Sequence, residues 1–228
     1  MKKIACLFWA LLCLLLLDPL GASAQSYNLD QVLGKMNEVG KTFQSMTANM
    51  DRSKTTLIVN DTVIDKGVIY VARRGKDTRI KIELKDPEQK MLLDKGKITL
   101  YFPKLKQAQE HVLAQGQSKS AEAALLVGFG QSSDSIKNFY HVTLIGEETI
   151  DGKKTSVIEL KPKDPKAAAQ FTAIRLWMDQ TRWIPVQTKT TEGSGDYMVI
   201  KFSNIKTNTK VSDSVFNLNM PKDVQIVR

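Results

Sequence analysis

RIKIELK, residues 79–85, alternates charged and apolar side chains at every step. In an extended chain successive side chains point to opposite faces, so the apolar residues of this stretch share one face and the charged residues share the other. The apolar set is Ile80, Ile82 and Leu84. A sheet that is covered on one face and wet on the other favours antiparallel pairing. The stretch therefore predicts one strand of an antiparallel sheet with a single apolar face.

The same period of two extends on both sides of this stretch. KITLYF, residues 97–102, repeats the pattern, and short turns such as DKG at 94–96 separate the runs. Such spacing predicts hairpins in a meander. More strands follow residue 138, including a hairpin around Asp151-Gly152. We expect about six strands before an interruption and five or six after it, in a sheet that must curl because strands twist.

Two helical segments are available to cover the apolar face of this sheet. Residues 28–46 carry apolar residues at steps of three and four, which predicts a helix capped by Asn28 and ending at Gly40. Residues 116–138 hold a glycine-bracketed stretch rich in alanine and leucine, which favours a short helix capped by Ser120. Two short helices can cover only part of so large a sheet. Either a cavity therefore remains or the sheet folds on itself.

The N-terminal residues have the layout of a secretory signal peptide: two lysines, a long apolar run and the small-x-small sequence Ala22-Ser23-Ala24. The alternative is an uncleaved membrane anchor, but the apolar run is shorter than the ~20 residues of a span. We predict a cleaved signal peptide over residues 1–24, a single domain over residues 25–228 and a periplasmic location. Both cysteines lie within the signal, so the exported chain contains no disulfide.

The sequence contains no recognisable catalytic or metal-binding pattern. His111 and His141 are the only histidines, and neither has a carboxylate or a second histidine at metal-ligand spacing. The net charge of +9 is scattered, without a basic stripe interleaved with aromatic residues, so nucleic acid is not an expected partner. The methionines of the predicted helices and strands are either core filler or the lining of a site for a greasy ligand. We predict no enzyme activity, no metal and no cofactor.

The stretch from Gly67 to His111 resembles the core of the LolA family, the periplasmic carriers of outer-membrane lipoproteins. The resemblance rests on a strand that opens with glycine and ends in arginine, an apolar strand, a turn, an aromatic strand and the segment PKLKQ. The second half agrees, because residues 174–192 resemble the family's Asp-to-Pro hairpin and residues 202–227 resemble its ending. The similarity covers nearly all of residues 25–228.

The resemblance implies an α+β fold in which a curved antiparallel sheet forms an unclosed β-barrel, or half-barrel, with a helical lid over a hydrophobic cavity. It implies a carrier that accepts acylated lipoproteins from an inner-membrane ABC-type extractor and hands them to an outer-membrane receptor. There are two alternatives. The protein binds or transports a free lipid or glycolipid, or it is a lipid-sensing module that binds another protein. The residues expected to line the acyl cavity are Ile69, Val71, Ile80, Ile82, Leu84, Met91, Ile98, Leu100, Phe102, Leu125 and Phe129.

Arg73 matches the arginine of the family's Arg-Pro pair. On the face of Ile69 and Val71 its guanidinium would look into the cavity and donate to carbonyls at the end of a lid helix, as a latch that an entering acyl chain breaks. The alternative is that Arg73 reaches the sheet edge and solvent. Arg74 stands where the family has proline and is expected to face water.

Overall fold

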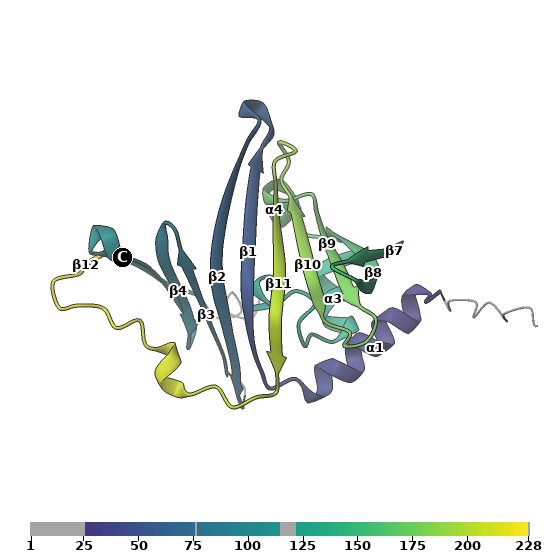
Figure 1. Ribbon diagram of the computed structural model, residues 1–228, viewed down its shortest axis with the longest axis horizontal. Coiled ribbons are helices and arrows are strands. Elements are labelled where there is room, and N and C mark those ends of the chain that lie inside the picture. The colour runs from purple at the N-terminus through teal and green to yellow at the C-terminus, as the bar shows by residue number, and fades with distance from the viewer. Residues whose placement is uncertain (1–25, 76, 115–121, 228) are drawn as a thin grey trace, which may run out of the picture.

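The structure, a computed structural model, describes residues 26–75, 77–114 and 122–227 (Figure 1). Its first six strands are β1 Ser45–Thr56, β2 Asp61–Arg74, β3 Asp77–Lys85, β4 Glu88–Asp94, β5 Lys97–Phe102 and β6 Gln107–Val112. Its later strands are β7 Tyr140–Ile150, β8 Lys153–Pro162, β9 Ala173–Asp179, β10 Pro185–Thr191, β11 Tyr197–Thr207 and β12 Gln225–Val227. The helices are α1 Leu29–Thr42, α3 Ser133–Phe139 and α4 Pro165–Gln170, with 3-10 turns η1 Leu57–Val59, η2 Pro103–Leu105 and η3 Asp213–Phe216.

The strands form one sheet in the order β12-β6-β5-β4-β3-β2-β1-β11-β10-β9-β8-β7. Neighbouring strands are antiparallel, except that β12 runs parallel to β6. β12 and β7 lie at opposite ends of the order, so the sheet does not close (Figure 1). The predicted curved, unclosed antiparallel sheet is confirmed, with its two halves joined through β1 and β11.

Helix α1 begins as its sequence predicts but ends later. The side chain of Asn28 accepts from the backbone N–H of Gln31, and the Gln31 side chain accepts from the Asn28 N–H, which forms a capping box. The predicted end at Gly40 was wrong, because α1 continues to Thr42. Gly40 serves a close contact instead: a Cβ there would lie 3.1 Å from the carbonyl oxygen of Gln131.

One face of the sheet, which we call the inner face, carries Ile69, Val71 and Ile80 and packs against helical segments. On β8 and β9 it is covered by α1 and α3, with residues such as Leu33 and Ile136 buried against the strands. On β1–β4 it is covered by residues 126–129. Residues 122–125 are helical, and the predicted cap at Ser120 lies outside the described residues. Helix α3, with Ser132 as its cap, was not predicted.

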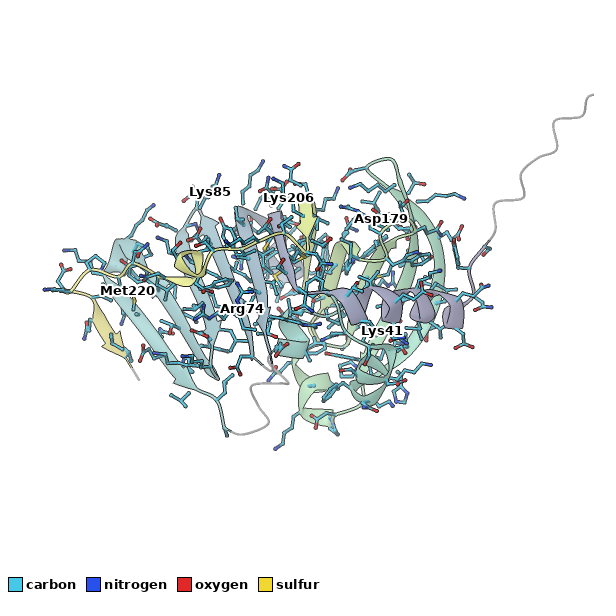
Figure 2. All side chains as sticks on the ribbon, turned by 90° about the horizontal axis from the view of Figure 1, so that it is seen from below. Lys41, Arg74, Lys85, Asp179, Lys206 and Met220 are labelled. Carbon is cyan, nitrogen blue, oxygen red and sulfur yellow. The ribbon has the colours of Figure 1, made fainter. Side chains whose placement is uncertain are left out.

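The opposite, outer face is not wet throughout, contrary to the expectation from RIKIELK. The segment of residues 208–227 runs across it (Figure 2). Beneath this segment Lys81 is only 5% exposed, and its Nζ donates to the carbonyl oxygens of Val215, at 2.7 Å, and Asn217, at 3.0 Å. The alternation of charges could not reveal this cover because it comes from a part of the chain more than 130 residues away.

In the described residues no helix is long and apolar enough to cross a membrane. The predicted signal peptide lies outside those residues.

Candidate functional site

The inner face brings together most of the residues that the sequence predicted for an acyl site. Four of them belong to a single buried cluster and are at most 2% exposed: Ile69, Val71, Ile80 and Phe129. Ile82, Ile98 and Leu125 pack at the border of that cluster, and Leu84 is buried nearby. Met91, Leu100 and Phe102 are half-buried on β4 and β5. The strand register places Met91 opposite both Ile82 and Leu100, which continues the apolar face from β3 to β5.

The inner cluster is completed by residues 122–131, which we call the covering segment. Phe129 enters the cluster and meets the ring of Phe202 edge to face, with 5.0 Å between the ring centroids. Gly130 has a positive φ of 64°, and a Cβ there would lie 2.5 Å from the ring of Phe43. Only glycine combines this backbone conformation with so close an approach. Two of the residues expected to line the acyl cavity, Leu125 and Phe129, thus belong to the segment that covers the strand residues of that set.

Arg73 joins the covering segment to the end of α1. Its Nη2 donates to the carbonyl oxygen of Gly130 at 2.8 Å, and its Nη1 donates to those of Phe43 at 3.3 Å and Gly40 at 3.5 Å. The guanidinium also lies 5.1 Å from the centroid of the Phe43 ring. Gly40 and Phe43 lie at the end of α1, and the latch role of Arg73 stays a prediction. All three acceptors are backbone carbonyls, so the charge of Arg73 has no carboxylate in direct contact among the residues described.

Burial lowers the pKa of Arg73 from its ordinary value, because desolvation disfavours the charged guanidinium, and the nearby negative charge of Glu122 acts in the opposite direction. Glu122 belongs to the covering segment. The electrostatic attraction therefore also acts between β2 and the segment that covers it.

Arg74 points to the other face of the sheet. Its Nη2 donates to the carbonyl oxygen of Val211 at 3.1 Å and lies 3.6 Å from Asp213, both in the segment that crosses the outer face. The side chain is exposed, as expected. Two consecutive arginines thus fasten different segments to the two faces of one strand, because adjacent side chains on a strand diverge.

Surface pockets lined by described residues lie on the outer face or at the sheet's ends. One of them, of about 730 Å³, lies between β3–β6 and the C-terminal segment. Most of its charged groups are paired: Arg79 bonds to Asp94 and Asp213, and Lys97 to Glu110. The residues expected to line the acyl cavity do not line these pockets, so the predicted hydrophobic cavity remains a proposal.

Sequence reasoning missed one polar pair above the inner cluster. Arg52 and Asp65 are opposite each other on β1 and β2, and Arg52 Nε donates to Asp65 Oδ2 at 2.9 Å. Asp65 is 5% exposed. Each residue stands in an alternating stretch of ordinary composition, so only the register reveals the pair. No group of three or more potential metal ligands occurs within residues 26–75, 77–114 and 122–227.

Comparison with known proteins extends these observations. Residues 41–219 match the sequence model of the family described as outer membrane lipoprotein carrier protein LolA. An uncharacterized protein of Methanocaldococcus jannaschii is 24% identical over 203 residues, which are 89% of this chain and 55% of that protein. The chain therefore spans about half the length of the curated relative it matches.

Two solved structures share the fold at low sequence identity. An uncharacterized conserved protein from Thermus thermophilus has a TM-score of 0.54 and 12% identity, with 87% of this chain and 98% of that chain covered. The MucA/MucB complex of Pseudomonas aeruginosa has a TM-score of 0.50 and 15% identity, with 86% of this chain and 62% of that chain covered.

Proposed function

This chain belongs to the outer membrane lipoprotein carrier (LolA) family, and on that premise we propose that it binds the acyl chains of lipoproteins and carries them across the periplasm. The observation that carries the proposal is the inner face, which has a continuous apolar surface from β2 to β5. The covering segment buries this surface on β2 and β3, and the surface is half-exposed on β4 and β5. An acyl chain needs such a surface.

The energetic need for a carrier follows from the ligand. Each buried CH₂ group contributes ~0.8 kcal/mol, so an acyl chain of common length gains on the order of 10 kcal/mol by leaving water. The ligand can use this energy to displace Phe129 and its neighbours from the inner cluster. A covering segment that is itself apolar keeps the surface dry until the ligand arrives.

Arg73 is proposed as the latch of this exchange. In the closed arrangement its guanidinium holds Gly130 to the end of α1 through backbone carbonyls alone. An acyl chain that moves the covering segment breaks these bonds and leaves the guanidinium without them. Return to the closed state restores the bonds, so the free energy of these bonds favours release of the ligand. Binding and release then depend on one two-state element.

The proposed partners are acylated lipoproteins, an inner-membrane ABC-type extractor and an outer-membrane receptor, and the proposed location of the chain, after removal of residues 1–24, is the periplasm. Enzyme activity, a metal and a cofactor have no part in the proposal. A second candidate function, a lipid-sensing module that binds another protein, is favoured by the MucA/MucB complex, in which the fold has a protein partner. A free lipid or glycolipid is the third candidate.

Mass spectrometry of material that co-purifies with the exported protein tests these candidates. The carrier predicts acylated polypeptide, a lipid transporter predicts free lipid, and a sensor predicts a stoichiometric protein without acyl groups. Met91→Gln, on the inner face, should reduce the acylated material several-fold, and its neighbour Lys90→Gln, on the outer face, should not. Depletion of the protein should make lipoproteins accumulate in the inner membrane. Absence of any acylated polypeptide from the wild-type protein would exclude the carrier function.

A further inference from the structure

The β1–β2 hairpin rises above the strands that flank it on the β3 side (Figure 1). β2 pairs with β1 over residues 61–72, but it pairs with β3 only from Gly67 onward. Residues 61–66 of β2 therefore have a strand on one side and, within the described part of the chain, no strand on the other. We call these residues the open edge.

The register identifies the backbone groups that point outward from the open edge. The N–H of Arg73 donates to the carbonyl oxygen of Gln44 at 2.8 Å, in line with the unbroken β1–β2 register. In an antiparallel pair the residues alternate between bonding to the partner and pointing away from it. Odd-numbered residues of β2 thus bond to β1, and Thr62 and Ile64 direct their N–H and C=O groups outward.

Apolar side chains accompany these free backbone groups on both faces. Val63 is 52% exposed on the inner side, and Ile64 is 66% exposed on the outer side. An exposed strand edge with apolar side chains is a template for the addition of another strand, whose backbone supplies hydrogen bonds and whose alternate side chains pack on the two faces.

Asp65 contributes a second observation at the same place. Its side chain is 6% exposed, and its Oδ2 is engaged by Arg52. Its Oδ1 is buried and accepts no hydrogen bond from any described residue. A buried carboxylate oxygen without a donor is costly, and a polar side chain that an added strand directs to the inner face would supply a donor. The open edge lacks backbone partners, and Asp65 lacks a side-chain donor on the inner face.

We propose that the open edge binds, as an added strand, the polypeptide segment that directly follows the acylated residue of the cargo. This inference rests on the proposed carrier function. The open edge begins on β2 where the pairing with β3 ends. The half-exposed apolar residues Ile82, Met91 and Leu100 lie on the neighbouring strands β3–β5. An acyl group seated on those residues leaves its attached polypeptide within a few residues of Ile64, since Leu84 is already opposite Gly67.

Three probes test the proposal: a triacylated cysteinyl peptide with six further residues, the same lipopeptide with alternate residues of that extension N-methylated, and triacylated cysteine amide alone. The wild-type protein should bind the first about tenfold more tightly than the other two, the equivalent of two or three added hydrogen bonds. Ile64→Pro removes an outward N–H that β1 does not use, so it should abolish this preference and leave the hairpin folded. Ile64→Thr keeps the N–H and should retain most of the preference.

Several results would overturn the inference. Equal binding of all three probes by the wild-type protein excludes strand addition and leaves the carrier function intact, whereas failure of every probe to bind overturns both proposals. Equally tight binding of the six-residue peptide without acyl groups removes the cargo as the occupant. If the protein is a dimer and Ile64→Pro dissociates it, the occupant is a second copy of the chain. If the protein binds phosphatidylethanolamine–phosphatidylglycerol vesicles through Ile58, which is 92% exposed, the occupant is a membrane. Should Ile64→Pro unfold, the N-methylated probe still decides the question.

Discussion

Replacement of Arg73 by leucine tests the latch most directly. The substitution removes the bond of 2.8 Å to the Gly130 carbonyl and the longer bonds to Phe43 and Gly40. It places an apolar side chain on the inner face in their stead. A hydrogen bond to a charged group contributes ~1.5–3 kcal/mol. Because the guanidinium is only half-buried, we expect the closed state to lose about 2 kcal/mol relative to the open state, which shifts the equilibrium about 30-fold.

Hydrogen exchange of the covering segment measures this shift. The N–H of Phe129 donates to the Leu126 carbonyl at 2.7 Å, and the N–H of Leu126 donates to the Glu122 carbonyl at 2.9 Å, so both amides report on the closed state. In Arg73→Leu their protection should fall about 30-fold, while amides of β8 and β9 keep theirs.

Arg74→Leu is the matched control, since it removes an adjacent arginine whose bonds lie on the outer face. It should leave the exchange of the covering segment unchanged. If Arg73→Leu leaves the protection of Phe129 and Leu126 as it is in the wild-type protein, or if Arg74→Leu lowers it equally, the latch is refuted. In a carrier, Arg73→Leu should also slow the transfer of bound lipoprotein to a receptor.

The remaining predictions concern packing. Gly130→Ala should lower the free energy of unfolding by about 2 kcal/mol or more, because its Cβ meets Phe43 and its φ is positive. Gly34→Ala, with open space around its Cβ, should stabilise helix α1 by up to ~1 kcal/mol, and urea unfolding compares the two variants. Phe129→Ala should cost ~3–5 kcal/mol in the same assay and should increase the binding of a fluorescent fatty acid, and a lower affinity for that probe would contradict the proposed site. Lys81→Met should make residues 208–227 more sensitive to limited proteolysis, because it removes two bonds to their carbonyls. Unchanged cleavage would show that the bonds of Lys81 are not needed to hold that segment.

The local pattern of the sequence determined the elements of the fold. Alternation in RIKIELK placed Ile80, Ile82 and Leu84 on a common face, and Asn28 marked the start of α1, because both signals depend only on residues close in the chain. The same parity placed Arg73 with Ile69 and Val71, and Arg74 on the opposite face. The expected contact of Arg73 with the end of a helix came from the resemblance to the LolA family rather than from the pattern.

The tertiary structure decided what covers each face. The sequence could not show that residues 208–227 bury Lys81 or that Phe129 fills the inner cluster. It also could not show that β2 extends beyond its pairing with β3 and leaves an open edge. Each of these depends on contacts between segments far apart in the chain. Side-chain periodicity tells which residues share a face, but burial depends on the path of a distant segment, and no local pattern carries that information.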